Sequence, residues 1–179
     1  MTTTEQIIDA IAADFSDLEN AGRMATVCFR LFLAAVLGGC LGYERESKGK
    51  AAGLRTHMLV ALGAAVFIMG PQLAKFDDAS ISRVIQGLVA GIGFLGAGAI
   101  VKGKPGEEIE GLTTAASIWM TAAIGTTAGM GRASTAILST ALALIVLTVM
   151  CRGVGWLHSG NGQLKKDASD CGRDESKKP

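Results

Sequence analysis

Residues 42–57 read Gly42-Tyr43-Glu44-Arg45-Glu46-Ser47-Lys48-Gly49-Lys50-Ala51-Ala52-Gly53-Leu54-Arg55-Thr56-His57, a charged stretch between two long apolar runs. A bilayer core about 30 Å thick requires roughly 20 mostly apolar residues per helix, and both flanking runs approach that length. The pattern predicts a membrane protein that carries a polar site at one face.

The rest of the chain is also apolar and rich in small residues. Among its 179 residues are 24 glycines, and only 18% are charged, which is unlike an average soluble domain. We expect an all-α fold, a polytopic membrane helical bundle of five transmembrane helices. The expected spans are Met24–Leu41, His57–Leu73, Val84–Val101, Leu112–Met130 and Ala133–Cys151.

The distribution of basic residues predicts how the spans are oriented, because Lys and Arg collect on the cytoplasmic side of a membrane. If residues 42–57 face the cytoplasm, that side carries twelve Lys and Arg residues against four on the other. We therefore expect a multi-pass protein of the bacterial cytoplasmic (inner) membrane, with the N-terminus out and the C-terminus in. The twelve are Arg45, Lys48, Lys50, Arg55, Lys102, Lys104, Arg152, Lys165, Lys166, Arg173, Lys177 and Lys178; the four are Arg23, Lys75, Arg83 and Arg132.

Three regions are expected along the chain: an extracytoplasmic segment (1–22), the membrane domain (23–152) and a disordered cytoplasmic tail (153–179). The first region has apolar residues at helical spacing, which predicts a short amphipathic helix on the outer surface or capping the bundle. A helix that binds a partner is the alternative. No basic segment precedes an apolar run there, so the first span is expected to direct insertion. The spaced apolar residues are Ile7, Ile8, Ile11, Phe15 and Leu18.

A glycine-rich run in the third span, Gly91-Ile92-Gly93-Phe94-Leu95-Gly96, matches the GxGxxG pattern of dinucleotide-binding proteins. We reject that interpretation because no strand-helix-strand pattern surrounds the glycines. In lipid, small residues instead let helix backbones approach closely, which predicts a tightly packed bundle and allows a homodimer. The residues expected at helix contacts are Gly38, Gly42, Gly87, Gly91, Gly93, Gly96, Gly98, Thr121 and Gly125.

Hydroxyl side chains line one face of the fourth span, where Thr113, Ser117 and Thr121 precede Gly125. The favoured interpretation is structural: Ser and Thr bond across helices or to carbonyls of their own helix. The alternative is a polar track, including Thr114, that borders a hydrated cavity and receives a cation or polar substrate.

Arg30 is the one charge well inside an expected span, where insertion scales assign a cost of roughly 2.5 to 3.5 kcal/mol. Its side chain is expected to reach the outer interface. A paired, functional Arg30 is the alternative.

Three interpretations apply to residues 42–57. The simplest is a stop-transfer loop in which Glu44 and Glu46 form local ion pairs, although this leaves Gly49 and Gly53 unexplained. In the second interpretation, residues 55–57 begin the second span, where helix amides favour an anion. Arg55 then holds a phosphate or lipid headgroup, or it clamps Glu44 or Glu46. In the third, Glu44 and Glu46 take part in a Mg²⁺ site through retained waters.

Residues 42–46 and 49–63 together resemble the signature of the MgtC/SapB family of bacterial inner-membrane proteins. The blocks Gly91–Gly98 and Gly111–Trp119 are similar to later motifs of that family, in the same order and spacing. The resemblance spans about residues 30 to 151. It implies a five-span protein of the cytoplasmic membrane connected with Mg²⁺ homeostasis and with virulence, as survival under low Mg²⁺ or host stress.

The resemblance assigns motif positions and leaves two differences. Many members continue into a soluble cytoplasmic domain that the short polar tail does not supply, and Glu110 stands where a basic residue is frequent. Together with Glu107 and Glu108 it makes the loop between the third and fourth spans acidic. A solvated loop is the favoured interpretation, and the alternative is a pore entrance that attracts cations. The motif positions are Glu44, Arg45, Glu46, Gly53, Leu54, Arg55, Thr56, Gly93, Gly96, Gly98, Leu112, Thr113, Thr114, Ala115, Ser117 and Trp119.

We expect a ligand or ion site at the cytoplasmic face, with Mg²⁺ as the candidate cofactor and Glu44 and Glu46 as its candidate ligands. A Mg²⁺ transporter or channel and a non-transporting regulator of another membrane protein are the alternatives. The expected partners are the lipid bilayer, a second copy of the chain and another membrane protein, without nucleic acid. No catalytic pattern is present, so an enzyme is not expected. The site residues are Glu44, Arg45, Glu46, Arg55, Thr56, Thr113, Thr114 and Ser117.

Overall fold

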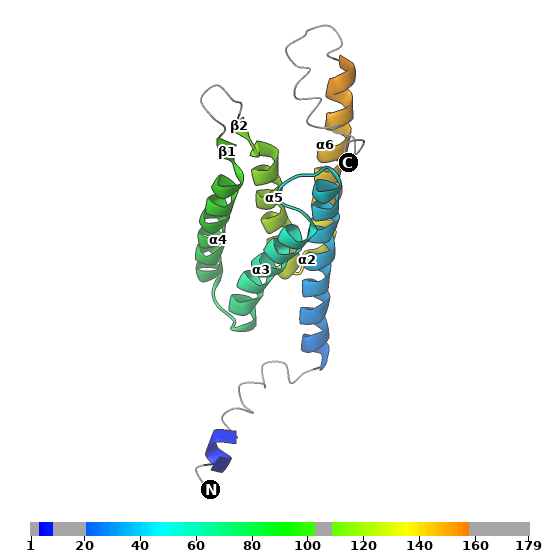
Figure 1. Ribbon diagram of the computed structural model, residues 1–179. Coiled ribbons are helices and arrows are strands. Elements are labelled where there is room, and N and C mark those ends of the chain that lie inside the picture. Colours follow the sequence, from blue (N-terminus) through cyan, green and yellow to red (C-terminus); the bar gives the residue numbers. More distant parts are fainter. Residues whose placement is uncertain (1–3, 9–20, 103–108, 158–179) are drawn as a thin grey trace.

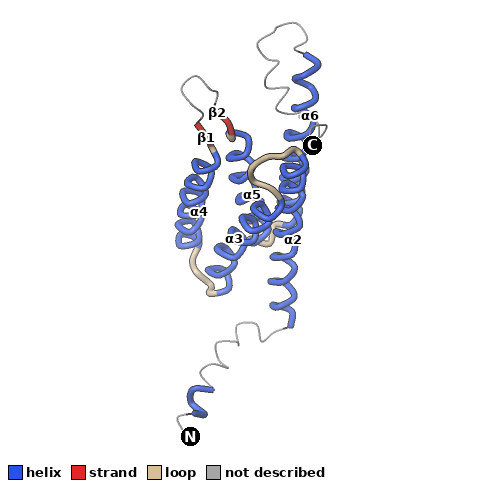
Figure 2. Tube along the Cα trace, in the orientation of Figure 1, coloured by secondary structure: helices blue, strands red, loops and turns tan. Residues whose placement is uncertain are grey.

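A computed structural model describes residues 4–8, 21–102 and 109–157 of the chain (Figure 1). The all-α class is confirmed in these residues, which are helical apart from short connections and one two-stranded hairpin (Figure 2). A helical stretch at residues 4–8 precedes the bundle. The bundle elements are α2 (Ala21–Ser47), α3 (Leu54–Leu73), α4 (Asp78–Ala99), β1 (Val101–Lys102), β2 (Ile109–Glu110), α5 (Leu112–Gly129) and α6 (Ala133–Leu157).

Helix α5 occupies the middle of the bundle and contacts α2, α3, α4 and α6. Helices α2 and α6 lie side by side, and α3 packs against α2 and α5, as Figure 1 shows. Helix α4 packs against α3 and α5 and lies at one side of the bundle. The start of α3 lies beside the last turns of α2, and the last turns of α3 and α5 lie near Arg30 in the first half of α2.

Helix α2 continues well past the apolar run that ends at Leu41. It includes Glu44, Arg45 and Glu46 and ends at Ser47, because these residues are good helix formers and the first residue with a left-handed backbone is Gly49 (φ +63°). The interpretation of residues 42–57 as a loop is thus wrong for their first half. The charged side chains stand on a rigid helix end.

Three helices, α2, α3 and α4, are long and apolar enough to cross a membrane. This indicates an integral membrane protein. Helix α5 is continuous, but Thr, Ser and Gly residues stand among its apolar residues. The apolar part described for α6, Ala133–Thr148, is shorter than a span. The count of five spans remains a prediction.

The connection between α4 and α5 contains an antiparallel hairpin that the sequence did not predict. Val101 pairs with Glu110 and Lys102 with Ile109, and residues 103–108, which include Glu107 and Glu108, lie outside the described part. Gly111 then adopts a left-handed backbone (φ +91°) at the start of α5, where an added Cβ would collide with the carbonyl oxygen of Ala99. Glycine is required there because any side chain would meet backbone.

Helix α4 begins at a side-chain cap. The carboxylate of Asp77 accepts a hydrogen bond from the Ser80 amide at 3.2 Å, which satisfies one of the unpaired amides of the first turn. The hydrogen bonds from Ser80 lower the pKa of the exposed Asp77 carboxyl below its ordinary value.

The core consists mainly of small residues that bring helix backbones into contact. A Cβ added at Gly38 would lie 2.7 Å from the His57 carbonyl oxygen, and one added at Gly42 would lie 2.7 Å from the Leu54 Cα, so α2 rests directly on α3. A Cβ added at Gly125 would meet the Ala61 carbonyl oxygen, which places α5 equally close to α3. The buried cluster around these contacts comprises Ala34, Leu37, Leu41, Ala61, Ala65, Ile124, Ala128 and Ala136.

The glycines expected at helix contacts divide into two groups. Gly38, Gly42 and Gly125 lie at the close approaches just described, and Thr121 is fully buried beside them. A Cβ at Gly96 would make ordinary contact with Ala115 at 3.7 Å. The other four lie on α4 with open space where a side chain would begin, within the described part of a single chain: Gly87, Gly91, Gly93 and Gly98. Gly129, which packs on the Ala65 backbone, was not among the predicted contact residues.

The two terminal segments are described only in part. Ile7 and Ile8 are exposed, and the remaining apolar residues of the expected amphipathic helix, at positions 11, 15 and 18, lie outside the described residues. Residues 158–179, most of the expected disordered tail, lie outside them too.

Substituting Gly125 tests the backbone contact between α5 and α3. We expect Gly125→Ala to lower the free energy of unfolding by about 1–3 kcal/mol, because the added methyl group meets backbone that cannot move without shifting a helix. Gly91→Ala is the matched control on α4, where space is open and the gain in helix propensity is at most about 1 kcal/mol. Thermal unfolding of the purified protein in detergent measures both. Equal losses in the two variants would contradict this account of the packing.

Candidate functional site

A buried ion-pair network stands on the last turns of α2. The Arg45 Nε donates a hydrogen bond to the Glu44 Oε2 at 2.5 Å, and the Lys48 Nζ lies 2.7 Å from the Glu44 Oε1. Glu44 is 8% exposed and Arg45 2% exposed. Lys48 faces Glu44 because the two are four residues apart on a helix. Its ammonium group also donates to the Leu147 carbonyl oxygen at 3.1 Å, which ties the end of α2 to α6.

The charges in this network do not cancel. One carboxylate faces two cations, so the group carries an excess positive charge. The contact of Lys48 with Oε1 is an ion pair without hydrogen-bond alignment, and Oε1 has no hydrogen-bond partner among the described residues. Glu44 is therefore held mainly by charge, and its loss would leave Arg45 buried without a counter-ion.

Glu46 has a different role on the next face of the helix. Its Oε2 accepts a hydrogen bond from the Leu54 amide at 2.7 Å, at the first residue of α3. A Cβ added at Gly53 would lie 2.6 Å from that oxygen, so a side chain there would displace the Glu46 carboxylate from its present position. The amides and the dipole at the start of a helix favour a negative charge. At the start of α3 this charge is the Glu46 carboxylate, in the place where the sequence suggested a bound anion.

His57 is fully buried and connects α3 with α5. Its Nδ1 lies 2.9 Å from the Gly53 carbonyl oxygen and its Nε2 3.2 Å from the Ser117 Oγ. A carbonyl only accepts hydrogen bonds, so Nδ1 carries a hydrogen. Ser117 in turn donates to the Thr114 carbonyl oxygen at 2.8 Å.

These contacts give the His57–Ser117 pair two arrangements that differ by one proton. An imidazolium ring donates to both Gly53 and Ser117, while Ser117 keeps its bond to Thr114. In a neutral ring Nε2 is an acceptor, and the single hydroxyl hydrogen of Ser117 can bond to it only by leaving the Thr114 carbonyl. The ring, the hydroxyl and the first turns of α5 are therefore coupled.

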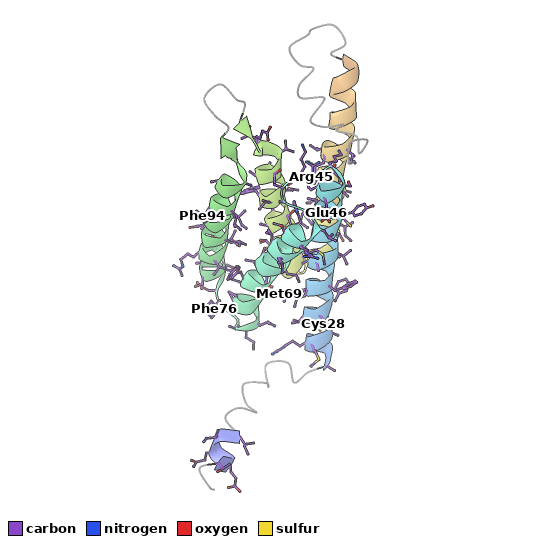
Figure 3. The ribbon with its side chains drawn as sticks, in the orientation of Figure 1. Cys28, Arg45, Glu46, Met69, Phe76 and Phe94 are labelled. Carbon is purple, nitrogen blue, oxygen red and sulfur yellow. The ribbon has the colours of Figure 1, made fainter. Side chains whose placement is uncertain are left out.

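The ion-pair network and His57 lie close together, because Gly42 brings α2 against the His57 Cβ, at 3.0 Å from an added Cβ. We call this group the polar cluster. Its members are Glu44, Arg45, Lys48, His57, Thr114 and Ser117, and they come from α2, α3 and α5, apart from Lys48, which directly follows α2. Figure 3 shows Arg45 and Glu46 toward one end of the bundle, with Cys28 and Met69 toward the other.

The hydroxyl face of α5 is bonded within its own helix. Thr121 donates to the Ser117 carbonyl oxygen at 2.8 Å, and Thr127 donates to the Ala123 carbonyl oxygen at 2.8 Å. Thr114, Ser117 and Thr121 are all buried, beside the close approach at Gly125. This geometry fits the structural interpretation of the hydroxyl face better than the polar track.

Other residues proposed from the sequence lie apart from the polar cluster. Arg55, Thr56 and Thr113 are exposed. Arg55 makes no hydrogen bond or ion pair with any described residue, so it does not clamp Glu44 or Glu46. The predicted site did not include Lys48 or His57. Two features of the sequence could have indicated them: Lys48 follows Glu44 by four residues, and His57 stands in the first turn of an apolar helix.

The described residues contain no group of three or more His, Cys, Asp or Glu side chains that could hold a metal ion. Glu44 is committed to two cations and Glu46 to a helix start. The prediction that these two carboxylates bind Mg²⁺ therefore finds no support in the geometry.

Arg30 lies toward the opposite end of α2 and is paired. Its Nη1 donates to the Gly129 carbonyl oxygen at 2.9 Å and to the Gln72 Oε1 at 3.3 Å. The guanidinium thus satisfies a carbonyl at the end of α5 and contacts the end of α3, so Arg30 is paired, as in the alternative interpretation.

Removing one charge of the buried Glu44–Arg45 pair should lower the free energy of unfolding much more than removing both charges. We expect Glu44→Gln to lower the free energy of unfolding by roughly 3–5 kcal/mol, because it leaves Arg45 buried and uncompensated. The double variant E44Q/R45M should recover most of this loss, since no buried pair is then broken. Chemical denaturation of the three proteins measures the difference, and equal stability of wild type and Glu44→Gln would contradict a buried ion pair.

Comparisons with known proteins agree with one another. A model of the MgtC family matches residues 31–154. Over 143 residues the chain is 40% identical to "Protein SrpB" of Synechococcus elongatus, covering 73% of this chain and 79% of that relative. It is 42% identical over 132 residues to "Putative magnesium transporter YhiD" of Escherichia coli, covering 70% of this chain and 60% of the relative.

A third relative is "Protein MgtC" of Brucella abortus, 45% identical over 113 residues, which are 63% of this chain and 46% of the relative. The matched part spans 60% of the length of the Escherichia coli relative and 46% of the length of the Brucella abortus relative. No solved structure matches the chain.

Proposed function

The chain belongs to the MgtC family, and from that premise we propose that it is a cytoplasmic-membrane protein acting in Mg²⁺ homeostasis through the polar cluster. The names of the relatives from Escherichia coli and Brucella abortus support the link to Mg²⁺. The proposed role includes adaptation to low Mg²⁺ and host stress, and it involves no catalysis.

The proposed topology has five spans, with α5 and α6 crossing the membrane beside α2, α3 and α4. The excess of twelve basic residues over four supports the N-terminus outside and the C-terminus inside. In this orientation the polar cluster lies at the cytoplasmic end of α2, with exposed Arg55 and half-buried Lys50 next to it.

The observation that carries the proposed mechanism is the pairing of buried Glu44 with two cations. Mg²⁺ takes hard oxygen ligands and gives up its waters reluctantly, so a pathway needs carboxylate or carbonyl oxygens that are free to bind it. A cluster with excess positive charge repels such an ion. This supports a protein that does not itself transport Mg²⁺, and the proposed role is the regulation of another membrane protein.

A Mg²⁺ transporter or channel is the second candidate. It is supported by the name of the Escherichia coli relative and by the hydroxyl groups of α5. In this alternative the cluster is a gate, and Lys48 and Arg45 move away from Glu44 when the ion passes.

Measuring Mg²⁺ flux separates the two candidates. We expect purified protein in liposomes to admit no more Mg²⁺ than empty vesicles, because Glu44 is neutralised by the chain itself. An enclosed Mg²⁺ indicator measures uptake, a Mg²⁺ ionophore shows that the vesicles are sealed, and a thermal transition shows that the protein is folded. Uptake by wild type that is lost in the stable E44Q/R45M variant would support the transporter and overturn the regulator.

A growth assay tests whether the cluster has a function beyond stability. In a bacterium that lacks its own MgtC-family protein and grows poorly at low Mg²⁺, we expect wild type to restore growth and E44Q/R45M to fail at equal membrane abundance. The matched control is Tyr43→Phe, a neighbouring side chain that is 70% exposed. Normal growth with E44Q/R45M would mean that the cluster only holds the helices together.

A further inference from the structure

A cleft of about 390 Å³ opens at the end of the bundle away from the polar cluster. It lies between the first turns of α2 and the last turns of α3, beside the end of α5. Met69, labelled in Figure 3, lies on its wall. The polar lining includes Arg23, Thr26, Arg30 and Gln72, and no acidic side chain lines it among the described residues.

Arg30 is held in one orientation within this cleft. Its Nη1 is committed to the Gly129 carbonyl oxygen and to Gln72. On the other side Gly131, with a left-handed backbone (φ +79°), packs so closely that an added Cβ would lie 2.5 Å from the Nη2. The left-handed backbone favours glycine at this position, and a side chain there would displace the Arg30 guanidinium.

The rest of the guanidinium remains available. An arginine has five N–H donors, and within the described residues Nε and Nη2 of Arg30 make no hydrogen bond. A planar pair of donors fixed in advance matches two oxygens of a phosphate and loses little entropy on binding. Arg23 contributes a second positive charge to the same cleft.

We propose that this cleft binds a phosphate group, with Arg30 as the bidentate donor and Arg23 as the supporting cation. The proposal is independent of the role in Mg²⁺ homeostasis, because it uses none of the polar cluster. The phosphate belongs either to a phospholipid headgroup, which the proposed topology places beside the outer end of α2, or to free inorganic phosphate. Both present the same oxygens to Arg30.

Two experimental arms distinguish the sources. The full chain is placed in nanodiscs of phosphatidylcholine alone or of phosphatidylcholine with phosphatidylglycerol, and retained lipid is identified by native mass spectrometry. Inorganic phosphate is titrated separately into the phosphatidylcholine sample, with chloride at equal ionic strength as the control, while thermal unfolding is followed. Selective retention of phosphatidylglycerol supports a lipid ligand, and stabilisation by phosphate alone supports the free ion.

Two variants test the site without removing the cap on α5 altogether. Arg30→Lys keeps a positive charge but lacks the planar fork. Thr26→Glu places a carboxylate one helical turn from Arg30, where it can pair with the guanidinium and compete with phosphate for it. We expect either change to weaken binding of phosphatidylglycerol or phosphate by at least about tenfold, the effect of losing one charge-assisted hydrogen bond or gaining a like charge.

The control is Arg83→Gln, an exposed arginine near the start of α4 whose guanidinium bonds Ser80 outside the cleft. It should leave binding unchanged. The proposal is overturned if neither probe binds wild type, if folded Thr26→Glu binds as wild type does, or if Arg83→Gln loses as much as the cleft variants. In these cases Arg30 serves only to cap α5.

Discussion

The contact of the α3 backbone with α2 and α5 is the constraint on which the rest of this structure depends. Gly38 and Gly42 admit α3 on one side, and Gly125 and Gly129 admit it on the other. Within a bilayer, helices gain little from burying apolar side chains, so close packing at small residues supplies much of the attraction between them. Placing α3 between its neighbours determines which polar groups are buried.

The polar cluster follows from that packing. Because α2 rests on the first turn of α3, the charged end of α2 is covered, and Glu44 and Arg45 must compensate each other. His57 is enclosed by the same contact and bonds across to Ser117. A buried polar network restricts the arrangement of the helices that contribute to it, because separating its members leaves charges uncompensated.

The opposite end of the bundle handles its charge differently. Arg30 satisfies the end of α5 with one nitrogen, and its side chain lines a cleft. Charged groups within membrane helices are costly, and they persist where they pair or bind. The two ends therefore differ in chemistry: a closed cluster with an internal counter-ion at one, and an open cationic cleft at the other.

Sequence patterns alone predicted the all-α class, the membrane character and the family, because apolar length, glycine content and ordered motifs are local properties. They also marked Glu44, Arg45, Glu46 and Ser117 as residues of interest. Local ion pairs of Glu44 were one of the interpretations left open, and the structure shows them with Arg45 and Lys48. The sequence did not predict that Glu46 caps α3. The glycines show the same division, since every Gly-rich span looked suited to helix contacts, yet Gly125 meets a neighbouring backbone and Gly91 faces open space.

The sequence by itself thus determined the helices, their membrane character and the residues that carry charge. Only the tertiary structure decided which charges are buried together and which, like Arg30, keep free donors, because burial and pairing depend on contacts between segments far apart in the chain.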